Sequence, residues 1–127
     1  MSLRKAVDPY ELRNAVAEVM PWLEGGPRPD RKVLAAAVRL SLRSLELTAP
    51  GHSVEVRVAP FAAVQCVPGP RHTRGTPPNV VETDPRTWLE LVVGRVGWDE
   101  ALEDGRIDAS GTRADVSPWL PLLRFAP

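Results

Sequence analysis

Hydrophobic residues recur every three or four positions in the first half of the chain, and this spacing predicts two amphipathic helices. The first begins behind Asp8, which can cap a helix whose first position is Pro9. The segment 24–29 (EGGPRP) interrupts the pattern. A second helix is predicted from Asp30 to about Leu47, before a Pro-Gly pair. Both helices are expected to bury one side.

The period changes to two at residues 53–58 (SVEVRV), which is typical of a strand with one buried face. The three valines are predicted to share the face that packs on the helices, and Glu55 and Arg57 to point the other way. Segment 62–67 (AAVQCV) follows a tight Pro-Phe corner and is predicted to complete an antiparallel hairpin. Segment 79–83 (NVVET) is predicted to be a third strand.

Residues 84–123 contain short predicted helices and a strand, each followed by a glycine. A helix is predicted behind Asp84 as far as Gly94, then a shorter helix as far as Gly105, then a strand leading to Gly111. Glycine is the residue that most readily adopts the left-handed conformation at the end of a helix. Inward-facing side chains are predicted at Trp98, Ala101 and Leu102 of the short helix and at Ile107 and Ala109 of the strand. A last short apolar helix is predicted to start at Ser117 and to carry Trp119, Leu120, Leu122 and Leu123.

Helices that precede a sheet, itself interrupted by further helices, predict an α+β fold. We expect a mainly antiparallel sheet with the helices packed on one face. Apolar periodicity continues on both sides of every proline cluster, which predicts a single domain over residues 1–127. Its N-terminal helices would span about 8–47, and its sheet with the remaining helices about 53–124.

This order of elements resembles that of sterol carrier protein-like domains. The similarity is tightest over residues 84–123 and looser over 30–83, and the stretch 60–85 (PFAAVQCVPGPRHTRGTPPNVVETDP) is similar to a small stand-alone bacterial branch of that family. The resemblance implies a small α/β module that encloses an apolar cavity between sheet and helices. It further implies a fatty acyl, isoprenoid or sterol-like ligand, and it implies no reaction.

Composition narrows the class of protein. Sixteen basic and sixteen acidic residues cancel, so no global field favours nucleic acid as a partner. A lone cysteine excludes an internal disulfide and a cysteine-rich zinc site. No run of about eighteen apolar residues is present, which predicts no membrane span. The N-terminus lacks the continuous apolar stretch of a signal peptide, so we expect a soluble cytoplasmic protein.

The apolar helix faces exceed what a small sheet with valine-sized side chains would cover. The excess predicts either a ligand cavity or packing on a second subunit. Core packing explains any single tryptophan, whereas cavity lining explains several together. The candidate cavity residues are Leu34, Val38, Leu42, Trp88, Leu89, Trp119, Leu120 and Leu123.

A long loop without apolar periodicity spans residues 68–79 (PGPRHTRGTPPN). Its central residues, Arg71, His72, Thr73 and Arg74, would suit the anionic or polar head group of a ligand. The alternative is that the arginines pair with Glu82 or Asp84 and brace the loop.

No catalytic or metal-binding constellation emerges from the sequence. His52, His72 and Cys66 lack the paired spacing of a zinc site, and Cys66 alternates into a strand as a small hydrophobic residue would. The acidic pairs at 99–100 and 103–104 are expected on the solvated side of a short helix. We therefore expect no cofactor, no metal and no catalytic residue.

Three functional hypotheses follow. The first is non-enzymatic binding of an apolar ligand in a cavity between sheet and helices. The second is a protein-interaction or accessory module with the cavity closed, including a homodimer. The third, an enzyme, has the least support because no cluster of acid, base and nucleophile is visible. A continuous apolar cavity would favour the first hypothesis, and a core without voids the second.

Overall fold

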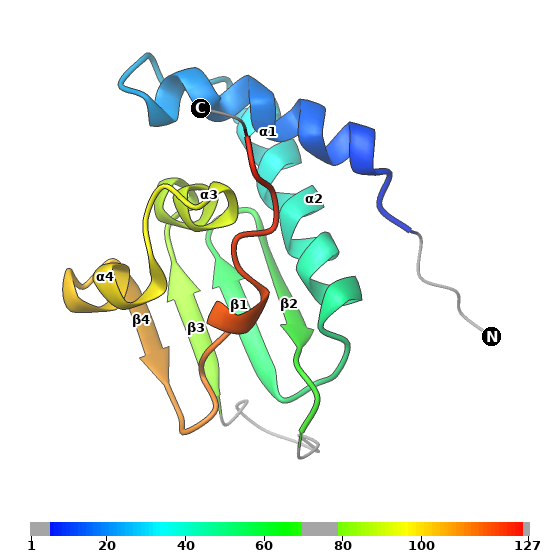
Figure 1. Cartoon of the computed structure of the whole chain (residues 1–127), viewed down its shortest axis with the longest axis vertical. Coiled ribbons are helices and arrows are strands. Elements are labelled where there is room, and N and C mark those ends of the chain that lie inside the picture. Colours follow the sequence, from blue (N-terminus) through cyan, green and yellow to red (C-terminus); the bar gives the residue numbers. More distant parts are fainter. Residues whose placement is uncertain (1–5, 70–78, 126–127) are drawn as a thin grey trace.

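A four-stranded mixed sheet is the centre of the computed structural model, which describes residues 6–69 and 79–125 (Figure 1). Its order is β2-β1-β3-β4, where the strands are β1 (Val54–Val58), β2 (Ala62–Cys66), β3 (Val80–Thr83) and β4 (Ile107–Ser110). The β1–β2 and β3–β4 pairs are antiparallel, whereas β1 and β3 run parallel. The predicted α+β fold with a mainly antiparallel sheet is therefore confirmed, and the β1–β3 pair makes the sheet mixed.

The helices pack in two levels. The helix α2 (Arg31–Thr48) packs against β2, and α3 (Pro85–Val93) packs against α2. The first helix, α1 (Pro9–Leu23), packs mainly on α2 and α3, whereas the short α4 (Trp98–Glu103) packs beside β4 (Figure 1). The sequence predicts that both N-terminal helices pack on the sheet. Instead α1 forms an outer level because its apolar stripe is buried chiefly against other helices.

Side-chain caps fix where two of the helices begin. The Asp8 carboxylate accepts a hydrogen bond from the Tyr10 amide at 2.9 Å. The Asp84 carboxylate accepts from both the amide and the hydroxyl of Thr87, at 2.8 and 2.9 Å. At the other end of α3, Gly94 adopts the predicted left-handed conformation with φ of +79°. The predicted starts of α1 and α3 are thus confirmed at the level of individual hydrogen bonds.

The alternation predicted for β1 is confirmed. Val54, Val56 and Val58 are fully buried, whereas Glu55 and Arg57 are only half-buried. Arg57 forms ion pairs with Glu55 on its own strand and, at 3.8 Å, with Glu82 on β3. One face of the sheet therefore belongs to the core, and the opposite face carries charged side chains.

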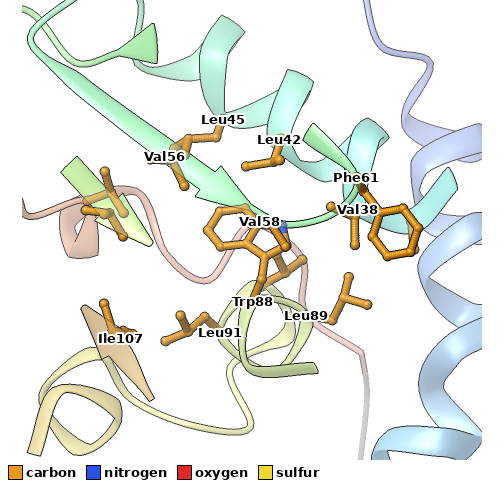
Figure 2. Close-up of a cluster of buried hydrophobic side chains, with 14 of the residues drawn as sticks. Val38, Leu42, Leu45, Val56, Val58, Phe61, Trp88, Leu89, Leu91 and Ile107 are labelled. Atoms are coloured by element: carbon orange, nitrogen blue, oxygen red, sulfur yellow. The ribbon is translucent and has the colours of Figure 1, made fainter. Parts of the chain in front are cut away.

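Trp88 occupies the middle of the core. Figure 2 shows its ring next to Val58 of β1, with Leu42 of α2 and Leu91 of α3 nearby. The ring is fully buried, and its Nε1 donates a hydrogen bond to Ser41 Oγ on α2 at 2.8 Å. This contact joins α3 to α2 above the apolar face of the sheet.

Three details of the prediction were wrong. The expected C-terminal helix is a single 3-10 turn, η1 (Ser117–Trp119), because Pro121 has no amide to continue a helix. Leu102 is 37% exposed on the outer side of α4. Ala109 is also exposed, because β4 lies at the edge of the sheet and buries only Ile107.

Candidate functional site

Five of the predicted cavity residues lie in the core and have no accessible surface. They are Leu34, Val38, Leu42, Trp88 and Leu89. A side chain with no accessible surface borders no void that admits a water molecule. In this conformation a ligand among these residues would require the helices to move apart, so their role as ligand contacts stays a prediction.

The other three predicted residues lie on the C-terminal segment. Trp119, Leu120 and Leu123 are half-buried and pack against the core from outside. After η1 the segment follows an extended path past the end of α3 towards α1 (Figure 1). These three residues therefore do not share a pocket with the five core residues, and Leu120 alone of the eight lines the pocket described next.

A half-open pocket of about 390 Å³ lies between the end of α3, the connection to α4 and the C-terminal segment. Its walls combine exposed backbone at Gly94 and Gly97 with side chains from all three parts. The apolar lining side chains include Leu91, Val93, Val96, Trp98, Leu120 and Phe125. A volume of this size falls within the range of about 300–1,000 Å³ that small-molecule sites occupy.

Two local features build the pocket. Gly94 turns the chain away from α3, and an added Cβ there would lie 3.5 Å from the Pro121 ring of the opposite wall. The Val92 carbonyl, free at the end of α3, accepts hydrogen bonds from the amides of Leu122 and Leu123 at 2.9 and 3.1 Å. The C-terminal segment is thus attached where the helix leaves a carbonyl without an intrahelical donor.

Arg124 is the one charged residue among those that line the pocket in the described part of the chain. Its side chain is exposed, and its carbonyl accepts a hydrogen bond from Arg13 of α1 at 3.2 Å. A guanidinium next to an apolar surface can receive a carboxylate or phosphate. The surface exposed in the pocket is more polar than apolar, so the pocket is suited to a ligand that has anionic or other polar groups as well as an apolar part.

The residues predicted to meet a head group, Arg71, His72, Thr73 and Arg74, lie outside the described residues. Their proposed bracing partners have contacts elsewhere: Glu82 pairs with Arg57 at 3.8 Å, and Asp84 caps α3. Both alternatives for this loop stay open.

Of the groups considered for catalysis, Cys66, His52 and the acidic pairs of α4 lie within the described residues, and His72 lies outside them. Burial raises the pKa of the Cys66 thiol to about 12, with a further contribution from Glu46, so the nucleophilic thiolate is suppressed at neutral pH. His52 Nδ1 lies 3.1 Å from Gln65 Oε1. Residues 6–69 and 79–125 contain no group of three or more histidine, cysteine, aspartate or glutamate side chains placed to hold a metal. The paired carboxylates of α4 lie at its surface, where Asp104 pairs with Arg106.

Sequence comparison places the chain in a family. A family model described as a bacterial SCP ortholog, where SCP stands for sterol carrier protein, matches residues 30–122. The chain belongs to this family. No curated protein matches the chain. The match covers α2, the whole sheet, α3, α4 and most of the pocket of this sterol carrier protein-like domain, and it leaves out α1, Arg124 and Phe125.

The helices of the described residues include none with the length and apolarity that crossing a bilayer requires.

Sequence reasoning missed most of the pocket. Leu91, Val93 and Trp98 lie in helices, and Val96 lies between them. The spacing of these residues is equally consistent with burial in the core. One signal was present: Pro121 lies within the apolar run 119–123 and prevents that run from forming a helix. An apolar run that cannot be helical has to pack against something else.

Proposed function

We propose that this sterol carrier protein-like domain binds an elongated apolar ligand with an anionic end and catalyses no reaction on it. The ligand class follows from the family and from the pocket, which combines apolar side chains with Arg124 at its edge. A fatty acid is the simplest molecule with this chemistry. Its carboxylate would meet the Arg124 guanidinium, and its chain would lie against Leu120, Trp98 and Val96.

The observation that carries the proposal is the half-open pocket of about 390 Å³. Apolar burial contributes about 0.8 kcal/mol per CH₂ group, so burial of the roughly fifteen carbons of a C16 chain contributes about 12 kcal/mol. This exceeds the free energy of micromolar binding, about 8 kcal/mol, by about the 4 kcal/mol that association costs at its low end. The pocket opens to solvent, so the remainder of a longer chain can extend out of it. Isoprenoid and sterol-like acids meet the same requirements.

The absence of a reaction is part of the proposal. It is supported by the suppressed thiolate of Cys66 and by the position of the His52 ring beside an amide. The pocket has Arg124 and Ser117 as its polar side chains within the described residues. Within the described residues, neither side chain forms a hydrogen bond with a general base, which nucleophilic catalysis requires.

A specific observation favours a second function. The five core residues predicted to line a cavity have no accessible surface, which is the arrangement expected of a protein-interaction or accessory module. In that case the same pocket would receive a side chain from a partner protein or from a second copy of this chain.

Titration with cis-parinaric acid, a naturally fluorescent C18 fatty acid, separates the two functions. We expect saturable binding with a micromolar dissociation constant and energy transfer from tryptophan. A Trp98→Phe variant should lose more of the transfer signal than Trp22→Phe, because Trp98 lines the pocket. Native mass spectrometry on the same sample would report bound acid and oligomeric state together. Failure of C8, C12, C16 and C18 acids to bind, with a dimer in the mass spectrum, would favour the interaction module.

A further inference from the structure

The outer wall of the pocket is a strap, defined as residues 120–125, that belongs to no helix or strand. Its first half is attached to α3 by the two hydrogen bonds that the Val92 carbonyl accepts from Leu122 and Leu123. Its second half, Arg124 and Phe125, lies beyond these bonds and still lines the pocket. Something else must hold this half in place.

That contact comes from Arg13 on the exposed side of α1. Its Nη1 donates a hydrogen bond to the Arg124 carbonyl at 3.2 Å, and its guanidinium lies 4.4 Å from the ring centroid of Phe125. Within the described residues, these are the interactions that the Arg13 guanidinium makes. One side chain therefore binds both the backbone and the aromatic ring of the last two described residues.

The contacts with Arg13 also determine which groups of Arg124 and Phe125 remain at the pocket. The hydrogen bond engages the backbone of Arg124, so its own guanidinium remains available at the pocket edge. Stacking on Arg13 engages one face of the Phe125 ring, and the residue also lines the pocket. We call these two contacts, from Arg13 to the Arg124 carbonyl and to the Phe125 ring, the clasp. If the clasp opened, the pocket would lose two lining residues at once.

We propose that Arg13 is a positioning residue that keeps the strap closed over the pocket and thereby controls how fast a bound ligand leaves. This inference rests on the proposed function, because it assigns a role to Arg13 in the binding of the same ligand. The clasp is formed by α1 and by Arg124 and Phe125, all outside the 30–122 region that the family model matches. The strap is therefore closed by parts of this chain that flank the family domain.

The test compares Arg13→Gln, Arg13→Lys and a control, Arg31→Gln, in the full chain. Arg31 is also an exposed arginine over an aromatic ring, 5.3 Å from the centroid of Phe61, but it does not line this pocket. Stopped-flow dissociation of cis-parinaric acid gives the rate. We expect Arg13→Gln to release the ligand about tenfold faster, a difference of about 1.4 kcal/mol in the barrier. Arg13→Lys keeps a cation and a donor, so it should restore most of the slow release, and Arg31→Gln should not differ from the parent.

A second measurement needs no ligand. Hydrogen exchange at the Leu122 and Leu123 amides should be faster in Arg13→Gln than in the parent. These amides are protected from exchange only while the strap is docked and they donate to the Val92 carbonyl. The midpoint of thermal unfolding should be nearly unchanged, since Arg13 lies outside the core.

These two measurements distinguish failure of the proposed ligand binding from failure of the proposed role of Arg13. If cis-parinaric acid binds no variant, the proposed function is wrong, and exchange still reports whether Arg13 positions the strap. If the acid binds and Arg13→Gln releases it at the parent rate, the role of Arg13 is overturned while ligand binding stands. Unchanged exchange at Leu122 and Leu123 would overturn the clasp itself.

Discussion

Trp88 of α3 donates its indole N–H to the hydroxyl of Ser41 on α2, and neither residue has contact with solvent. The Ser41 hydroxyl in turn donates to the Ala37 carbonyl one helical turn earlier, at 2.7 Å. The indole N–H of the largest core side chain thus has its acceptor in a serine on the buried face of α2, where the other residues are apolar. The hydrogen bond fixes how α3 is rotated against α2.

Removal of the Ser41 hydroxyl should therefore lower the free energy of unfolding by more than the loss of a small side chain would. We expect Ser41→Ala to lower the free energy of unfolding by about 1–3 kcal/mol, because the Trp88 N–H would remain buried without an acceptor. Urea denaturation measures this difference. Ser44→Ala on the same helix, where the serine is half-buried, should change stability by less than about 0.5 kcal/mol. Equal effects of both substitutions would mean that the indole finds another acceptor.

The side-chain cap of α3 should stabilise the protein more than the cap of α1. Asp84 accepts two hydrogen bonds from Thr87 at the start of a helix that is part of the core, whereas Asp8 accepts one at an exposed end. We expect Asp84→Ala to destabilise the protein by about 1–2 kcal/mol and Asp8→Ala by about 0.5 kcal/mol. Asp84→Asn keeps an acceptor and should lie between the parent and Asp84→Ala. Denaturant midpoints of the four proteins check this order, and a reversed order of the two alanine variants would contradict it.

The helix starts and the inward valines could be predicted because they depend on residues a few positions apart. Asp8 precedes a proline at the first helical position, and Asp84 does the same, so each cap is visible in a four-residue window. The buried face of β1 follows from strict alternation. Each of these features is decided by local chemistry, and the sequence contains all of it.

The parallel pair and the pocket depend on contacts between distant segments. Nothing in the valine pattern says that β1 runs parallel to β3, since Val81 would be equally buried opposite Val56 in either direction. The strap is attached through the Val92 carbonyl, which becomes available only because α3 ends there. Sequence spacing assigned Trp98 to the core and did not reveal that one side of it borders a pocket.

Cys66 should make the protein less stable at alkaline pH. Burial, with a smaller contribution from Glu46, raises the thiol pKa from 9.0 to about 12. Between these two pH values the unfolded chain loses the thiol proton and the folded chain keeps it. The stabilisation is therefore complete below about pH 9 and is lost as the pH rises towards 12. We expect the free energy of unfolding to fall more steeply from pH 8 to pH 10.5 in the parent than in Cys66→Ala.

The rate at which the Cys66 thiol is chemically modified tests the same raised pKa. A disulfide reagent such as DTNB reacts with the thiolate, so at pH 8 it should modify folded Cys66 at least about a hundredfold more slowly than the urea-unfolded chain. Rapid modification of the folded protein would show that the thiol is accessible, and it would support a nucleophilic role for Cys66.

Gly97 allows the pocket to be filled without straining the backbone. The residue lines the pocket in an extended conformation, with φ of −85° and ψ of 157°, that any amino acid can adopt. An added Cβ would meet no atom within 4 Å. Gly94, on the same wall, is left-handed and would be strained by any side chain, so it is the poorer position for this test.

We expect Gly97→Phe to weaken the binding of cis-parinaric acid at least about tenfold, because the ring would occupy space that the acyl chain needs. The matched control is Gly97→Ala, which also replaces the glycine before α4 but adds a single methyl group. The two variants should unfold within about 0.5 kcal/mol of each other, since both lose the same helix-capping glycine and the ring enters open space. Isothermal calorimetry gives the affinities, and thermal unfolding gives the stabilities. If Gly97→Phe binds the acid as tightly as Gly97→Ala, the ligand lies elsewhere, and the core between sheet and helices becomes the place where the protein must open to receive it.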